Sequence, residues 1–196
     1  MKLLTTSLIL AVLLISMMLL ADFSYAASSS SHTNFSPDEK PRTLTSPNVQ
    51  SGGEFGWSVS MSGKLVTVGA PFELADGYSE AGHAYVFNAT SGALITTLTS
   101  PNAKHDGFFG FSVSMSGKLV TVGAPGESAD GYDYAGHAYV FNAISGALIT
   151  NLTSPNAPGW FGYSVFMSGK LVTVGAPYET ADGDSGAGHA YIFYNV

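Results

Sequence analysis

The sequence contains no cysteine, which excludes disulfide bridges, thiolate nucleophiles and thiolate metal sites together. Charged residues are scarce as well, at 11% of the 196 residues, and only 7 Lys and Arg stand against 14 Asp and Glu. Nucleic acid backbones are bound by clustered basic side chains, so this balance argues against a nucleic acid partner. Stability must therefore come from apolar packing, for which a chain of this length has enough residues.

One long apolar run occupies the N-terminus, from Leu3 to Leu20, and small residues follow it at Ser24 and Ala26. This pattern predicts a signal peptide over residues 1–26 that is removed after Ala26. The alternative is an uncleaved membrane anchor, because the run approaches the length of a spanning helix. In both cases we expect the rest of the chain to be secreted or held at the cell surface, with no other contact with a membrane.

The remainder consists of a polar segment followed by three copies of one unit. Residues 27–42 are rich in Ser and lack hydrophobic periodicity, which predicts a flexible linker. The segment 58–71 recurs letter for letter at 112–125, and at 164–177 with a single change, Phe166 for Ser. Units of this length are typical of propeller blades or solenoid turns. We therefore expect one domain over 43–196, with repeats at about 49–102, 103–156 and 157–196.

Each unit is predicted to hold four antiparallel strands, which in the first unit span 56–61, 64–69, 83–88 and 93–99. Ser62-Gly63 and the Gly-bearing segment 89–92 supply the hairpin turns, since Gly adopts positive φ without strain. The third strand is apolar on both faces, as expected for a blade that lies between two others. The fold class is therefore all-β, with four-stranded propeller-type blades and an N-terminal signal helix.

The end of the fourth strand, Leu-Thr-Ser-Pro-Asn, occurs at 98–102 and 152–156, and also in front of the first unit at 44–48. The last unit stops at Val196 without it. The chain thus begins with a copy of the strand that its last blade lacks, an arrangement that can latch the two ends of a propeller. Because three blades are fewer than the usual four to eight, we expect two chains to complete a six-bladed ring, or chains to link by strand exchange.

Every unit carries Phe-Gly before its first strand and Gly-Ala-Pro after its second: Phe55-Gly56 with Gly69-Ala70-Pro71, Phe109-Gly110 with Gly123-Ala124-Pro125, and Phe161-Gly162 with Gly175-Ala176-Pro177. In this the chain resembles the FG-GAP repeat family, the blade repeat of the integrin α-subunit propeller and of many secreted prokaryotic proteins. The resemblance covers about 43–196 and implies propeller blades, an extracellular setting, and adhesion or binding of a protein or glycan ligand. A fold alone does not fix a function.

The resemblance also implies a calcium loop, but the corresponding turn here, residues 61–64, offers no carboxylate. We therefore expect no cofactor at that turn. The segment after each Gly-Ala-Pro varies among the copies and predicts an exposed recognition loop. Its candidate ligand-binding residues are Glu73, Asp76, Tyr78, Glu127, Asp130, Tyr132, Glu179, Asp182 and Asp184. Their carboxylates can hold a calcium ion; the competing interpretation is that Asp76-Gly77 and its copies only form turns.

His83, His137 and His189 recur at one position, where three imidazoles can meet a metal or each can simply bond to a neighbouring blade. No adjacent carboxylate supports the metal, so we favour the second interpretation. Repeated residues do not provide the unlike neighbours that acid–base or nucleophilic catalysis needs, and we expect no enzyme activity. The sequence therefore predicts a binding or adhesion module. The alternatives are a self-assembling surface or filament protein, an enzyme, or a fragment of a larger propeller.

The aromatic residues near the loops, Trp57, Tyr132, Trp160 and Tyr178, are candidates for stacking on sugars. Packing between blades explains aromatic residues equally well, so the sequence leaves both interpretations open.

Overall fold

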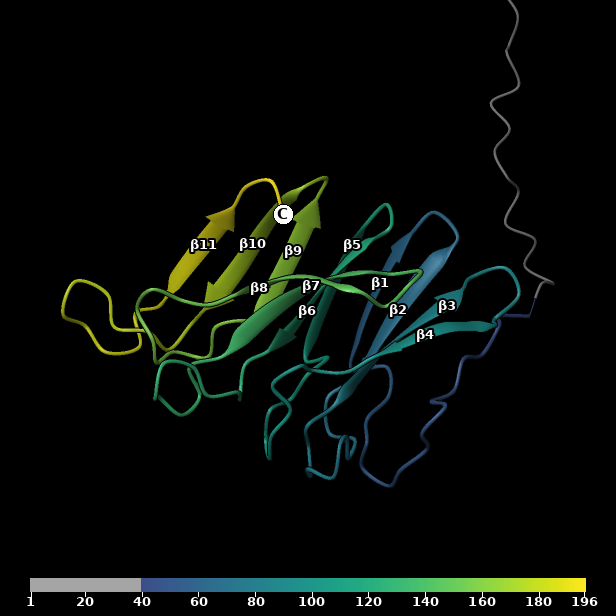
Figure 1. Cartoon of the computed structure of the whole chain (residues 1–196), viewed down its shortest axis with the longest axis horizontal. Helices are drawn as coiled ribbons and strands as arrows, with labels where there is room; N and C mark the ends of the chain where they lie inside the picture. The colour runs from purple at the N-terminus through teal and green to yellow at the C-terminus, as the bar shows by residue number, and fades with distance from the viewer. Residues whose placement is uncertain (1–39) are drawn as a thin grey trace, which may run out of the picture. The chain divides into compact units, whose positions relative to one another are not determined.

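A computed structural model describes residues 40–196 of the chain. The predicted signal peptide and most of the predicted linker lie outside the described residues. The described part contains eleven strands (Figure 1). Among residues 40–196, no helix has the length and apolar character needed to cross a membrane.

The unit Arg42–Val196 is built of three antiparallel sheets, here called blades 1, 2 and 3, whose strands are adjacent in chain order (Figure 1). Blade 1 contains β1 (Ser58–Ser62), β2 (Leu65–Ala70), β3 (His83–Asn88) and β4 (Leu94–Leu98). Blade 2 contains β5 (Ser112–Ser116), β6 (Leu119–Ala124), β7 (His137–Asn142) and β8 (Leu148–Leu152). Blade 3 has three described strands, β9 (Ser164–Ser168), β10 (Leu171–Ala176) and β11 (His189–Phe193).

These sheets confirm the predicted all-β, propeller-type architecture, and the predicted strands are correct within about two residues at their ends. The first hairpin turn lies one residue later than predicted, because Ser62 pairs with Leu65 and the turn itself is Gly63-Lys64. Gly63 adopts the expected positive φ of 59°. β4 carries a bulge opposite the step from Val86 to Phe87.

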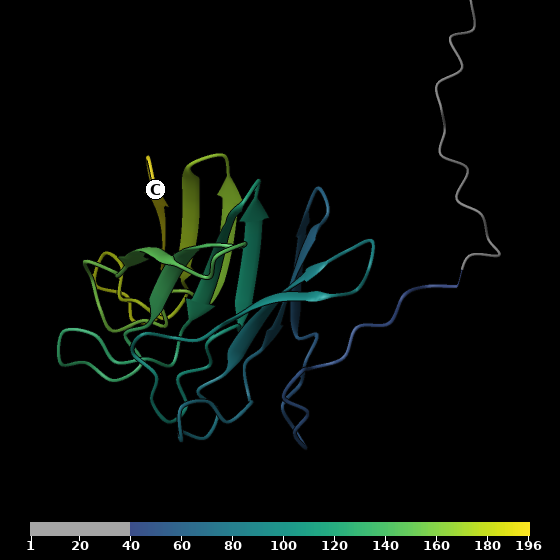
Figure 2. The ribbon, with the colours of Figure 1, turned by 45° about the vertical axis from the view of Figure 1, so that its right-hand side comes forward.

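The first strands of the three blades, β1, β5 and β9, are neighbours in space (Figures 1 and 2). The same hydrogen bonds join both pairs of blades. The Ser60 hydroxyl of blade 1 accepts a bond from the Met115 amide of blade 2 at 2.9 Å, and Ser114 accepts from the Met167 amide of blade 3 at 2.9 Å. The blades are therefore stacked through one repeated contact.

The hydrophobic core lies between the blades. Ala84 and Val86 on β3 pack in one cluster with Val113, Met115 and Phe141 of blade 2. The equivalent cluster between blades 2 and 3 contains Ala138 and Val140 together with Phe161, Met167 and Val174. Blade 2 thus buries both of its faces.

The glycine of each Gly-Ala-Pro motif permits a close approach between blades. A Cβ added at Gly69 would overlap the carbonyl oxygen of Gly110, and one at Gly123 would overlap that of Gly162. At Gly175 the only close contacts of such a Cβ are with Ser164 of its own blade. The first two glycines are therefore required by the backbone of the next blade.

Candidate functional site

The Phe-Gly and Gly-Ala-Pro motifs of one blade lie at the same end of its sheet. In blade 1, Ser58 at the start of β1 is paired with Gly69 near the end of β2. The segments before the first strand and after the second strand therefore form one surface, here called the loop end, and the other two blades repeat this pairing.

The variable segments at the loop end form short hairpins. In the first, Ala75 and Tyr78 exchange two backbone hydrogen bonds of 3.1 and 2.8 Å, while Asp76 and Gly77 at the tip have φ of 51° and 85°. The same turn forms at Asp130 and at Asp182. Asp76-Gly77 and its copies do form turns, and the tips are exposed, including Tyr78, Tyr132 and Asp184.

The three glutamates occupy a different place. The expectation that they lie in exposed loops is wrong, because Glu73, Glu127 and Glu179 are at most 1% exposed. Each is the second residue after Gly-Ala-Pro, at the start of the loop, and its side chain points into the protein. Glutamate recurs at this position in all three copies, but so does the exposed Asp-Gly that follows, so recurrence alone did not distinguish the buried residue.

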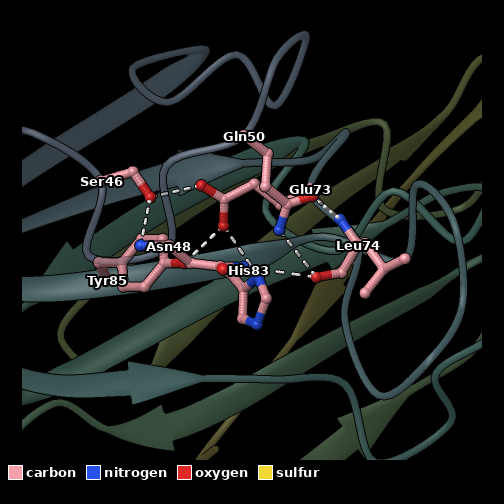
Figure 3. A network of polar contacts seen from close by, with 7 residues as sticks. All are labelled: Ser46, Asn48, Gln50, Glu73, Leu74, His83 and Tyr85. Atoms are coloured by element: carbon pink, nitrogen blue, oxygen red, sulfur yellow. Dashed lines mark hydrogen bonds and ion pairs between the residues drawn. The ribbon is translucent and has the colours of Figure 1, made fainter.

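Each buried glutamate is the centre of a polar network (Figure 3). Glu73 Oε2 accepts a hydrogen bond of 2.5 Å from the Tyr85 hydroxyl and lies 2.9 Å from His83 Nδ1. Glu73 Oε1 accepts a hydrogen bond of 2.5 Å from Ser46, which belongs to the segment before blade 1. A carboxylate with these donors is satisfied internally.

The other blades repeat the tyrosine and histidine contacts, but within residues 40–196 no donor reaches Glu127 Oε1 or Glu179 Oε1 as Ser46 reaches Glu73. Glu127 accepts from Tyr139 at 2.5 Å and lies 3.0 Å from His137. Glu179 accepts from Tyr191 at 2.5 Å, and its 2.8 Å contact with His189 has hydrogen-bond geometry, which the other two histidine contacts lack.

The predicted histidine partner is thus corrected: each histidine contacts a glutamate of its own blade, not a neighbouring blade. That glutamate is also the nearby carboxylate that the sequence did not reveal, because it lies ten residues upstream of the histidine. Within residues 40–196, no group of three or more His, Asp or Glu is placed to hold a metal ion.

The tyrosines of these networks are held as neutral phenols. Burial raises the pKa of Tyr139 well above its usual value, and the negative charge of Glu127 raises it further. The pKa of Tyr85 is also raised, first by burial and then by its hydrogen bond to Glu73. The same causes, in the same order, raise the pKa of Tyr191. The networks therefore connect the loop end to β3, β7 and β11, and their role is structural.

A second feature of the loop end is a row of aromatic side chains that crosses all three blades. Ring centroids are 5.3 Å apart for Trp57 and Phe72, 5.5 Å for Phe72 and Phe108, 6.4 Å for Phe108 and Trp160, and 5.6 Å for Trp160 and Tyr178. We call these five residues the aromatic strip. Trp57 and Tyr178, at its two ends, are 49% and 55% exposed.

The sequence predicted only part of the strip: Trp57, Trp160 and Tyr178 were candidates for stacking on sugars, but Phe72 and Phe108 were not. Its members occupy fixed offsets: each stands directly before or after a Phe-Gly, or directly after a Gly-Ala-Pro. Those offsets, read together with the strand pairing, were the signal that these rings share one surface.

A pocket of about 230 Å³ adjoins the strip between blades 2 and 3. Tyr134 and Trp160 line it as stacked rings 5.5 Å apart, and Tyr178 and Asp133 complete its polar side. Partly exposed aromatic rings beside a carboxylate suit a ligand that has both apolar surface and hydroxyl groups.

The model of the FG-GAP repeat matches residues 40–87, 94–141 and 155–193. The first two matches begin 54 residues apart, so residues 40–44 correspond to β4 at 94–98. A search of curated proteins found no match to the chain.

Proposed function

Since the chain belongs to the FG-GAP repeat family, we propose that it is a non-enzymatic binding module that works outside the cell and holds a glycan along its aromatic strip. The apolar N-terminus, typical of an export signal, supports the extracellular setting. The three FG-GAP repeats support a role in adhesion or ligand binding.

The aromatic strip is the observation that carries this proposal. Aromatic residues at a surface supply large contact area at a small entropic cost, and Trp57, Tyr178 and Tyr134 remain 42–55% exposed at the loop end. Packing between blades does not require that exposure.

The charges around the strip favour a neutral sugar. The exposed hairpin tips carry Asp76, Asp130, Asp182 and Asp184, and carboxylate oxygens accept hydrogen bonds from hydroxyl groups. The chain as a whole has a net charge of −7, which repels acidic ligands.

Titration with neutral oligosaccharides selected on a glycan array tests the proposal. We expect Trp160→Ala and Tyr178→Ala each to weaken binding by about tenfold, or 1.4 kcal/mol. Tyr194→Ala is the matched control, because Tyr194 is 68% exposed but follows β11 at the opposite end of blade 3. Equal affinity in all three variants, or no glycan bound by the parent chain, would refute the proposal.

A further inference from the structure

The two ends of the blade stack carry the apolar halves of a contact that the molecule already forms twice. Ser168 also retains the hydroxyl position at which Ser62 and Ser116 accept hydrogen bonds from the amides of Gly117 and Gly169. We call the outer face of blade 1 the head and the outer face of blade 3 the tail. We propose that two copies of this chain join head to tail at both ends and close a six-bladed ring.

The head exposes residues that are buried within the stack. Val59 and Met61 on β1 are 65% and 64% exposed, whereas Val113 and Met115, at the same positions of β5, are 9% and 6% exposed beneath blade 1. The sequences of β1 and β5 are identical. Only the absence of a preceding blade within the described residues distinguishes the two strands.

The tail shows the complementary pattern. Ile192 on β11 is 57% exposed, whereas Val86 and Val140, at the same position of the other blades, are fully buried beneath the blade that follows. Phe166 replaces the serine that accepts hydrogen bonds from the Met115 and Met167 amides inside the stack, so the tail offers an apolar side chain, 65% exposed, in place of that hydrogen bond. The tail therefore presents the kind of apolar surface that covers Val113 and Met115 inside the stack.

The tail also has a strand edge without a partner in residues 40–196, because β11 is the outer strand of a three-stranded sheet. The equivalent strands β3 and β7 pair with β4 and β8. An exposed edge of this kind is a template for a strand from another chain.

The segment before blade 1 has the sequence and the position of that missing strand. Leu44 packs on the cluster of Tyr85 and Phe87, just as Leu98 of β4 packs with Tyr139 and Phe141 of the next blade. A Cβ at Gly92 would contact Arg42 and Leu44, and one at Gly146 would contact the equivalent Thr96 and Leu98. The segment therefore already lies where the fourth strand of a preceding blade would lie.

This segment can pair with β11 of a second copy as β4 pairs with β3. In the register of β4, Leu44 would face Ala190 and Thr43 would face Tyr191. Pro41 would fall at the position of Ile95, which the bulge of β4 leaves without a partner. Proline, which has no amide hydrogen, is tolerated at such a position.

Two copies of the three described blades are compatible with a closed ring. Two chains of three blades give six, within the range of four to eight in which propellers close, whereas three chains would give nine. The ring would also bring two aromatic strips to one face, so a ligand with repeated units would bind with avidity.

The first test is the mass of the full chain by light scattering and native mass spectrometry. We expect two copies at micromolar concentration. A single copy up to about 100 μM, or polymers that grow with concentration, would overturn the proposal.

A mixing experiment tests the head-to-tail orientation. Met61→Lys blocks the head and Ile192→Lys blocks the tail, and we expect each variant alone to be a single folded copy, since both positions are exposed. Mixed together, they retain one intact junction and should form a one-to-one pair that grows no further. Failure to pair on mixing would overturn the head-to-tail contact. Ile144→Lys, at an exposed position of the β7–β8 hairpin, is the control and should stay a two-copy ring.

The strand donation has its own pair of variants. Arg42→Pro removes an amide that, in the register of β4, would bond to Ile192 of the second copy, and should raise the dissociation constant of the ring at least tenfold. Pro41→Ala changes only the bulge position and should leave it within a factor of two. Equal effects of both substitutions would overturn the proposed register.

Discussion

Blades 2 and 3 contain the same strand, Leu-Val-Thr-Val-Gly-Ala, with different surroundings. In β6 every residue after Leu119 is buried, whereas in β10 Thr173 is half-buried and Leu171 is 45% exposed. The strand-forming pattern is identical, so the difference arises only from the blade that follows blade 2. A blade in this protein therefore owes much of its stability to its junctions with other blades.

Replacing the buried glutamates should give the largest difference between blades 2 and 3 in the loss of free energy of unfolding. Glu127→Ala removes the described partner of the Tyr139 hydroxyl and should lower the free energy of unfolding by about 3 kcal/mol. Glu179→Ala should cost about 1 kcal/mol, because Tyr191 is only partly buried and water can accept from its hydroxyl, whereas Tyr139 is 1% exposed.

Urea unfolding measures both values, with the Met61→Lys chain as the background so that assembly does not contribute. If the two losses are equal, the networks do not depend on their place in the stack.

A smaller difference is expected for the glycines of Gly-Ala-Pro. Gly123→Ala forces a methyl group against the carbonyl oxygen of Gly162 and should cost about 2 kcal/mol. Gly175→Ala meets only the Ser164 side chain, which can rotate, and should cost under about 1 kcal/mol. Unfolding in the same single-copy background compares them, and a larger loss at Gly175 would contradict the assigned role of the next blade.

The smallest expected effect is the loss of folding stability at alkaline pH that Tyr139 causes. The pKa of Tyr139 is raised above the usual value of 10 in the folded chain, so the unfolded chain loses this proton first. The stabilisation is complete below pH 10 and is lost as the pH rises above it, by at most about 1.4 kcal/mol per pH unit for this tyrosine.

Tyr139→Phe should flatten this loss of stability between pH 10 and 11, which urea unfolding at each pH measures. Tyr132→Phe, at a hairpin tip that is 52% exposed, should leave the slope unchanged. An unchanged slope in Tyr139→Phe would show that this phenol does not act as inferred.

The fold was largely readable from the sequence because the repeats present one pattern three times. Turn glycines and strand alternation are local signals, and they placed β1 to β4 within about two residues. That blade 3 has three strands within residues 40–196 could also be predicted, since Leu-Thr-Ser-Pro-Asn does not recur after 152–156.

The candidate site was predicted less well because it depends on contacts across the sheet. Glu73 and His83 are ten residues apart in sequence, and only the strand pairing brings them to within 2.9 Å. The position of a residue in a loop also does not reveal its burial. Glu73 at the start of the loop is buried, whereas Asp76 at the tip of the same loop is exposed. The aromatic strip joins residues from three repeats and so has no local signature.

Hydrogen exchange of the β11 amides tests the claim that the head of one chain completes the tail of another. At a concentration that gives two copies, the account predicts that β11 exchanges as slowly as β7, and that Met61→Lys, a substitution on a distant strand, restores fast exchange at β11. Fast exchange at β11 in the parent chain, or slow exchange that Met61→Lys leaves unchanged, would contradict it.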